Sequence, residues 1–160
     1  MMRKSSHLIQ FPQSEPKQCP VCEEDQVQTS LETNTLTYGV GSDAVELTVT
    51  IPVKTCHLCG FRFTDDIAEE IEHEAVCQHL SVMTPKEIKA MRQRYPLSQS
   101  ELSQITRIDE ESLSRWEKGE VIQNAALDNL LYLLKFHENL DRLKTRYADN
   151  PQMFKQRALG

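Results

Sequence analysis

Four of the five cysteines form two Cys-x-x-Cys pairs, Cys19 with Cys22 and Cys56 with Cys59, and 33 residues separate the pairs. Two residues between thiols allow a tight turn to direct both sulfurs at one ion, and two such turns complete the tetrahedron that zinc prefers. The spacing therefore predicts one structural zinc ion per chain, bound by these four cysteines. Four thiolates leave no open position for water or substrate.

The segment between the pairs has the pattern of two strands. The stretches VQTSLETNTLTYGV and VELTVTIPVKT are rich in Val, Thr, Ile and Leu and alternate in polarity, and GVGSD overlaps their junction as a turn. We expect an antiparallel hairpin that carries the two cysteine turns, in a zinc domain over residues 19–64. Because so small a domain has little core, metal binding should supply much of its folding free energy.

Other interpretations of the cysteines have less support. A redox Cys-x-x-Cys motif is typically single and lies near a βαβ unit, a pattern that this sequence lacks. Since a structural zinc site is full at four ligands, nearby His and Cys side chains should be ordinary surface or core residues. These are His57, His73, His79 and Cys77.

Charge divides the chain into two halves. Residues 1–82 carry 5 Lys and Arg against 13 Asp and Glu, whereas residues 83–160 carry 13 against 11. Nucleic acid would repel the acidic half, so that only the second half could be drawn to it. No apolar run approaches the roughly 18 residues that a membrane span needs, and the N-terminus lacks the apolar stretch of a signal peptide. We expect a cytoplasmic protein.

A connecting segment is expected over residues 65–83. Ile67, Ile71 and Ala75 recur there at helical spacing, with acidic residues on the other faces. The acids have two interpretations, a solvated face or a surface for a basic protein partner. Thr84 as an N-cap and Pro85 at the first helical position should begin the next domain.

Residues 84–147 have the punctuation of a helical domain. Helices are expected from Thr84, from a Ser98 cap and from an Asp109 cap, with Gly119 as a left-handed C-terminal residue. A long final helix should run from an Asn124 cap to residue 144. Two short helices joined by a turn, the second with a basic residue facing outward, form the layout of a helix-turn-helix.

The stretch LSQSELSQITRIDEESLSRWEKGEVIQNAALDNLLYLL resembles the Xre/Cro-type helix-turn-helix family, whose Ser-Arg-Trp-Glu-x-Gly signature is matched by Ser114, Arg115, Trp116, Glu117 and Gly119. With the two upstream cysteine pairs, residues 19–137 resemble the YgiT-type zinc-finger/helix-turn-helix family, which includes the MqsA type of antitoxin. The resemblance implies an α+β two-domain fold, with a zinc-binding β-hairpin domain joined by a helix to an all-α domain.

Two functions follow from the resemblance. The leading one is a dimeric, sequence-specific transcriptional repressor that binds operator DNA. The alternative is an antitoxin whose zinc domain neutralises a ribonuclease toxin while the helix-turn-helix autoregulates the operon. We find no phosphate loop, activated nucleophile or open metal site, and do not expect an enzyme. Oxidation that ejects zinc and releases DNA is a further hypothesis.

Helical periodicity selects the residues that would face DNA, once Leu113 and Trp116 are assigned to the core. They are Gln99, Glu111, Ser114, Arg115 and Lys118. Arg115 could instead form an ion pair with Glu111, four residues earlier. Lys86, Lys89, Arg92 and Arg94 have two interpretations, phosphate contacts or solvated surface.

The sequence departs from the family pattern at two places. Arg107 stands in the turn where Gly is usual, and Glu111 stands where the MqsA-type antitoxin has Asn, so that antitoxin's operator does not transfer. The final helix carries more apolar side chains than one stripe can bury, which predicts a dimer interface at Leu130, Leu133, Leu134 and Phe136. Residues 1–18, expected to be a flexible extension, and the tail 148–160 lie outside the resemblance.

Overall fold

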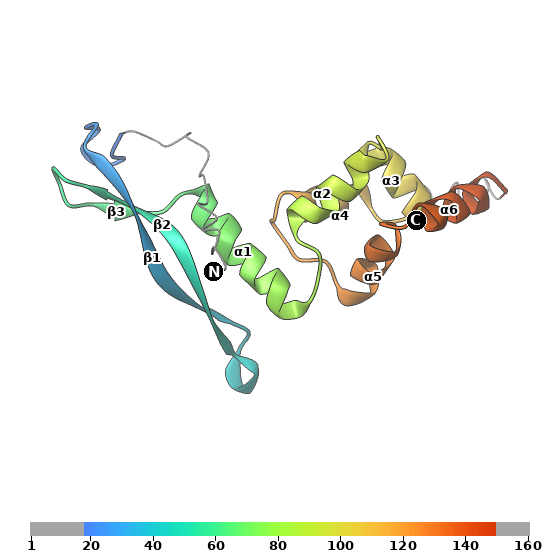
Figure 1. Ribbon diagram of the computed structural model, residues 1–160, viewed down its shortest axis with the longest axis horizontal. Coiled ribbons are helices and arrows are strands. Elements are labelled where there is room, and N and C mark those ends of the chain that lie inside the picture. The colour runs from blue at the N-terminus through green and yellow to red at the C-terminus, as the bar shows by residue number, and fades with distance from the viewer. Residues whose placement is uncertain (1–17, 150–160) are drawn as a thin grey trace, which may run out of the picture.

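The computed structural model describes residues 18–149, so that most of the predicted N-terminal extension and most of the tail lie outside the described residues. The chain has two halves that lie end to end along its long axis (Figure 1). The zinc half consists of a long β-ribbon and helix α1, and the helical half consists of helices α2 to α6. The predicted α+β architecture is confirmed. No helix of residues 18–149 has both the length and the apolar character of a membrane span.

The predicted hairpin is present. Strands β1 (Val27–Tyr38) and β2 (Val45–Cys56) pair in antiparallel register from Val27 opposite Cys56 to Tyr38 opposite Val45. The connection contains a short 3-10 turn, Gly41–Asp43. Gly39 in this connection has a φ of 92°, and a Cβ there would lie 2.8 Å from the carbonyl oxygen of Asp43, so the turn requires glycine. Strand β3 (Arg62–Phe63) pairs with the other edge of β2.

Helix α1 (Asp66–Leu80) does more than connect the halves. Alternation along β2 places Val49, Ile51 and Val53 on one face of the ribbon, and α1 covers this face with Ala68 and Ile71. A two-stranded ribbon with one apolar face needs such cover to be stable. The predicted connecting helix is therefore also part of the packed zinc half.

A buried ion pair fixes the start of α1 to the ribbon. The ammonium of Lys54 on β2 lies 2.6 Å from a carboxylate oxygen of Asp65, and the Lys54 side chain is 2% exposed. Asp65 also caps α1 by accepting a hydrogen bond from the N–H of Ile67. Burial alone would raise the pKa of Asp65, but the hydrogen bond and charge of Lys54 outweigh it, so that the pKa is lowered.

The joint between the halves is tightly held. Ser81 ends α1 in the left-handed conformation, and Met83 inserts into the helical core, where it is 5% exposed. The N–H of Met83 donates to the buried carboxylate of Asp128 at 2.8 Å, and its carbonyl accepts from the Gln123 amide at 2.7 Å. Gln123 also donates to Asp128. Both backbone polar groups of Met83 are thus satisfied inside the protein.

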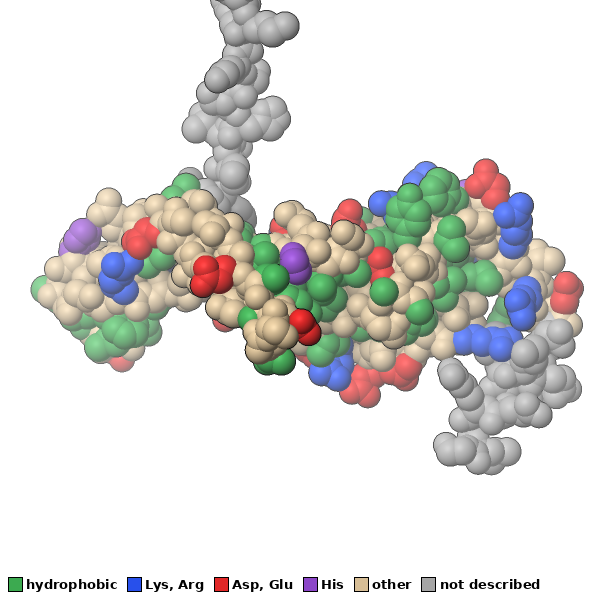
Figure 2. Space-filling model, turned by 90° about the horizontal axis from the view of Figure 1, so that it is seen from below, with side chains coloured by type: hydrophobic (Ala, Val, Ile, Leu, Met, Phe, Trp, Pro, Cys, Tyr) green, Lys and Arg blue, Asp and Glu red, His purple; other side chains and the backbone are tan. Residues whose placement is uncertain are grey.

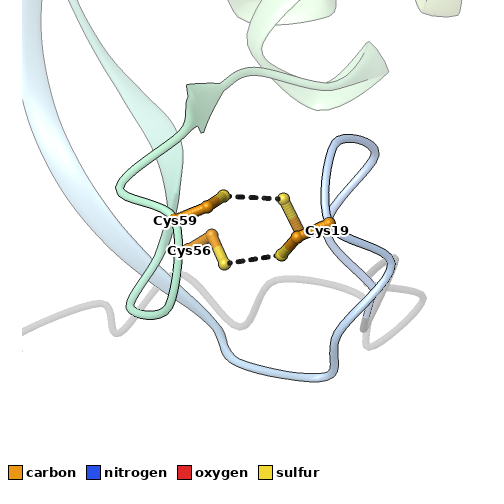
Figure 3. Close-up of side chains that lie close together, drawn as sticks. Cys19, Cys56 and Cys59 are labelled. Carbon is orange, nitrogen blue, oxygen red and sulfur yellow. Dashed lines mark hydrogen bonds between the residues drawn. The ribbon is translucent and has the colours of Figure 1, made fainter.

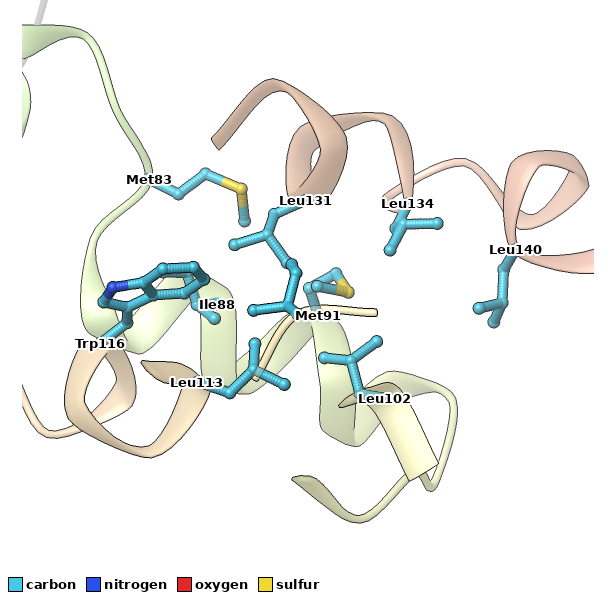
Figure 4. Packing of buried hydrophobic residues seen from close by; sticks show 10 residues of the cluster. Met83, Ile88, Met91, Leu102, Leu113, Trp116, Leu131, Leu134 and Leu140 are labelled. Atoms are coloured by element: carbon cyan, nitrogen blue, oxygen red, sulfur yellow. The ribbon is translucent and has the colours of Figure 1, made fainter. Parts of the chain in front are cut away.

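The helical half contains α2 (Pro85–Arg94), α3 (Gln99–Thr106), α4 (Glu110–Glu117), α5 (Ala125–Leu133) and α6 (His137–Asp149). The expected caps are confirmed, and Thr84 and Ser98 each form a full capping box with the glutamate three residues later. Asp109 and Asn124 cap α4 and α5. The apolar side chains meet in one core, Met83, Ile88, Met91, Leu102, Ile108, Leu113, Trp116, Leu131, Leu134 and Leu140 (Figure 4).

The prediction of one long final helix is wrong, because the chain breaks between α5 and α6. The Asn139 side chain donates to the carbonyl of Leu133 at 2.9 Å and satisfies it at the break. In an uninterrupted helix Leu134 and Leu140 would lie about 120° apart around the axis. The break allows both side chains to enter the same core, where each is at most 1% exposed.

We expect Lys54→Met to destabilise the folded chain by about 3 kcal/mol, because it leaves the Asp65 carboxylate without its partner. Since the pKa of Asp65 is lowered in the folded protein, the contribution of the pair is present above about pH 4 and is lost as the pH falls through that lowered pKa. Urea unfolding at several pH values measures both effects.

Arg62→Met is the matched control, because Arg62 forms an exposed pair with Glu32 on the same ribbon. Exposed pairs contribute about 0–1 kcal/mol. Equal destabilisation by the two variants would contradict the role given to the buried pair.

Candidate metal centre and nucleic-acid interface

The four predicted ligands meet at the end of the ribbon. The sulfurs of Cys19 and Cys59 are 3.5 Å apart, as are those of Cys22 and Cys56, and all four lie within 4.8 Å of one another (Figure 3). A zinc ion with four Zn–S bonds of about 2.3 Å needs S–S separations of about 3.8 Å. The cluster therefore has the chemistry and size of a structural zinc site, as predicted.

The two cysteine turns have the same geometry. The residues that follow the pairs, Glu23 and Gly60, have φ values of 60° and 76°, and the N–H of each donates at 2.9 Å to the carbonyl of the first cysteine of its pair. The sequence places Glu23 where the second pair has Gly60, but a glutamate gives no signal of a left-handed turn, so the shared geometry could not be predicted. The N–H groups of Cys59 and Leu58 lower the pKa of Cys56 to about 7, whereas at Cys22 a backbone N–H is outweighed by burial and the neighbouring thiols, which raise the pKa to about 12.

The remaining His and Cys side chains lie elsewhere, as expected. His57 is exposed and shares a 2.6 Å hydrogen bond with Gln28, and the ring of His79 contacts Tyr38. His73 lies beside Gly119, and Cys77 is fully buried. Among the described residues, the cluster of potential ligands is formed by the four cysteines.

Helices α3 and α4 form the predicted helix-turn-helix. Arg107 ends α3 with a φ of 63°, and its N–H donates to the Ser103 carbonyl at 2.7 Å. Ile108 in the turn is buried, and the hydroxyl of Thr106 accepts from its N–H. The turn thus adopts the left-handed conformation with arginine in place of glycine, at a steric cost that these contacts offset.

A buried ionic network lies beneath α4. Glu117, whose side chain is 4% exposed, receives two hydrogen bonds from Arg92 at 2.6 and 2.7 Å and a third from Gln99 at 3.0 Å. Arg92 also donates to the carbonyl of Leu97. Burial would raise the pKa of Glu117, but Arg92 and Gln99 lower it. The network joins α2, α3 and α4, and it was not predicted, because its members are 7 to 25 residues apart in the sequence.

The expected DNA-facing residues share the accessible side of α4. Glu111, Arg115 and Lys118 are exposed, and Ser114 is half-buried. Gln99 opens α3 but is engaged with Glu117. Arg115 lies 3.5 Å from Glu120, not in the ion pair with Glu111 that was considered as an alternative. Trp116 is in the core, as predicted.

The four cations of the first helix divide into different roles. Lys86 lies 3.0 Å from both Glu70 and Glu74 of α1, and Arg92 belongs to the internal network. Arg94 lies over the ring of Tyr95, and Lys89 is exposed. Phosphate contact is therefore not available to Arg92, which is engaged inside the protein, whereas the exposed Lys86, Lys89 and Arg94 keep both interpretations.

The predicted dimer interface needs correction. Leu134 is fully buried in the monomer core, so its side chain is not free for a partner, and Leu130 is partly buried against that core. Leu133 and Phe136 are about half exposed, at 49% and 50%, and Tyr132 beside them is 50% exposed and packs edge-on against Phe136. The break after α5 turned Leu134 inward and left this smaller apolar patch outside.

We expect Cys59→Ser to abolish zinc binding and to raise amide hydrogen exchange over residues 19–64, because three thiolates and a hydroxyl make a poor zinc site. The helical half should keep its protection, since its core contains no zinc ligand. Cys77→Ser, outside the cluster, is the control and should retain one zinc per chain. Metal analysis and exchange mass spectrometry test both, and unchanged exchange after zinc loss would contradict a structural metal.

Comparison with known proteins agrees with this arrangement. A model of the family described as the antitoxin component of a bacterial toxin-antitoxin system, MqsA, matches residues 17–144. No curated protein matches the chain. The match spans the cysteine cluster, α1 and the helix-turn-helix, and it favours the antitoxin alternative over a repressor unconnected with a toxin. The chain belongs to the MqsA antitoxin family.

Proposed function

We propose that this chain neutralises a basic, RNA-cleaving protein toxin through its zinc half and represses the toxin's operon by binding operator DNA, as a dimer, through α3 and α4. The observation that carries the proposal is that one chain joins an acidic domain with a four-cysteine cluster to a helix-turn-helix. In the face drawn in Figure 2, most Lys and Arg side chains lie over the helical half.

The cysteine turns offer a surface for the toxin. Val21 and Leu58 at the tips of the turns are 61% and 65% exposed, and Phe61 nearby is 41% exposed and stacks on Phe63. Exposed apolar side chains grouped on a rigid support are typical of protein interfaces. Glu23, Glu24 and Asp25 follow the first turn and are exposed.

The charge of this half favours one class of partner. Enzymes that act on RNA carry Lys and Arg side chains for the phosphate backbone, and an acidic surface can attract and cover them. We therefore assign the excess of acidic residues in residues 1–82 to attraction of a basic partner, in addition to solvation of the surface. A zinc ion bound by the four cysteines would hold both turns in place, so that the surface would be formed before the toxin arrives.

The helical half supplies the DNA-binding end. Arg115 can donate two hydrogen bonds to a guanine edge, Ser114 can reach base or phosphate, and Lys118 suits phosphate. Two recognition helices must be spaced to meet successive major-groove faces, which a two-fold dimer achieves. The exposed Tyr132, Leu133 and Phe136 are the apolar surface that such a dimer would cover.

We expect Leu58→Lys to weaken toxin binding at least tenfold, because it removes an apolar contact and places a cation against a basic partner. Val40→Lys is the matched control: Val40 is 85% exposed at the hairpin connection and adds the same charge away from the cysteine turns. A ribonuclease encoded beside this gene, which the proposal requires, would be titrated against both variants by calorimetry, with zinc content verified. Equal toxin affinities of the two variants would show that the toxin does not bind at the cysteine turns.

We expect Arg115→Gln to reduce operator affinity by about 10- to 100-fold, the loss typical of one bidentate base contact. Arg62→Gln on β3 changes the net charge equally and should leave operator affinity unchanged. Operator fragments selected from the upstream region of the operon and random duplexes would be compared by fluorescence anisotropy. An equal loss on both kinds of DNA would assign Arg115 to phosphate contact.

A further inference from the structure

Glu120 lies just beyond α4, the proposed recognition helix, in a position fixed by backbone hydrogen bonds. Gly119, with a φ of 73°, turns the chain at the end of α4, and its N–H donates to the Trp116 carbonyl at 3.1 Å. The N–H of Glu120 donates to the Arg115 carbonyl at 2.9 Å. These two bonds form a Schellman motif, which holds the residue after the glycine against the last turn of the helix.

The carboxylate of Glu120 reaches both basic side chains of the recognition helix. One oxygen lies 3.5 Å from Nε of Arg115 and the other lies 4.0 Å from Nζ of Lys118. The three side chains are 48%, 64% and 50% exposed for Arg115, Lys118 and Glu120. The pairs are therefore accessible, and an incoming phosphate can compete for the same cations.

The helix itself gives no reason for an acid at this place. The C-terminal end of a helix has partial negative charge, so a carboxylate there is unfavourable and a cation is favoured. The attraction of Arg115 and Lys118 offsets this, but only by reducing the positive field that those residues present to DNA. A carboxylate in contact with both cations occupies the place that a phosphate would take.

We propose that Glu120 acts as an intramolecular substitute for DNA phosphate that suppresses binding to non-operator DNA. This inference rests on the proposed operator binding by α4. On random DNA, Arg115 and Lys118 both bind phosphates and must both give up the carboxylate. At an operator, the base contacts of Arg115 compensate for that loss. Glu120 thereby raises the ratio of specific to nonspecific affinity.

The helical half has so small a positive excess that one carboxylate can change its affinity for DNA measurably. Residues 83–160 carry 13 Lys and Arg against 11 Asp and Glu, so the helical half lacks the large positive excess that would hide a single acid. Glu110 and Glu111 begin the same helix and add to the repulsion of phosphate. The basic group formed by Arg115 and Lys118 is thus flanked by acids at both ends of α4.

The test compares Glu120→Gln with Glu46→Gln, an exposed glutamate on β2 that makes the same change in net charge. With a random-sequence duplex, we expect Glu120→Gln to bind about three- to tenfold more tightly than the wild type. The slope of log affinity against log salt should become steeper by about one ion. Operator affinity should rise less, so that the specificity ratio falls. Glu46→Gln should change neither quantity appreciably.

A double-mutant cycle assigns the effect to the contact. In a Lys118→Gln background, the gain from Glu120→Gln should shrink by at least half, because one of the two cations has gone. The Schellman bonds are backbone bonds, so the variant should keep the wild-type melting temperature, which circular dichroism verifies. Equal affinity of the Glu120 and Glu46 variants for random DNA would overturn the inference.

Failure of the proposed function would look different. If neither the wild type nor Glu120→Gln prefers an operator, but Glu120→Gln binds random duplex more tightly than Glu46→Gln, operator recognition fails and the suppressing role of Glu120 stands. If the wild type prefers its operator and the Glu120 and Glu46 variants bind random DNA equally, operator recognition stands and the suppressing role of Glu120 fails.

Discussion

The arrangement of the two halves depends on how Met83 is held. Its side chain belongs to the helical core, its N–H and carbonyl are bonded to Asp128 and Gln123, and α1 ends only three residues before it. A buried carboxylate of this kind is stable because it accepts from both a backbone N–H and an amide. The segment that joins the halves is therefore internal structure. Lys86 at the start of α2 also forms ion pairs with Glu70 and Glu74 in the first half and middle of α1.

Local signals made much of this fold predictable. Thr84, Ser98, Asp109 and Asn124 each cap a helix because a short polar side chain can satisfy an N–H two or three residues ahead, whatever surrounds it. The cysteine pairs are predictable for a related reason, since two thiols three positions apart fit one ion by turn geometry alone. In each case the residue and its partner lie within one turn of chain.

Longer-range contacts could not be predicted in the same way. The sequence alone predicts an ordinary strand residue at Lys54, because its partner Asp65 lies beyond the strand and contacts it only after folding. It likewise predicts a surface acid at Asp128, because the bonded backbone of Met83 is 45 residues away in the sequence. The break before α6 has the same origin. Apolar periodicity alone favours one continuous helix through residue 144, and only the common core of Leu134 and Leu140 makes interruption the better solution.

These contacts explain why the sequence indicates the family clearly but gives little information on the bases that the proposed DNA site would contain. Within the Ser-Arg-Trp-Glu-x-Gly signature, Trp116 fills the core, Glu117 binds Arg92 and Gln99, and Gly119 supplies a left-handed turn. All three residues maintain the fold, so a helix-turn-helix with the same packing requires the same residue types at these positions. The accessible positions Glu111, Ser114 and Arg115 lie outside the helical core, so under the proposed operator binding, selection for a particular DNA sequence is free to change them. A sequence pattern that fixes the architecture is for this reason a poor guide to the bases that α4 would contact under the proposed function.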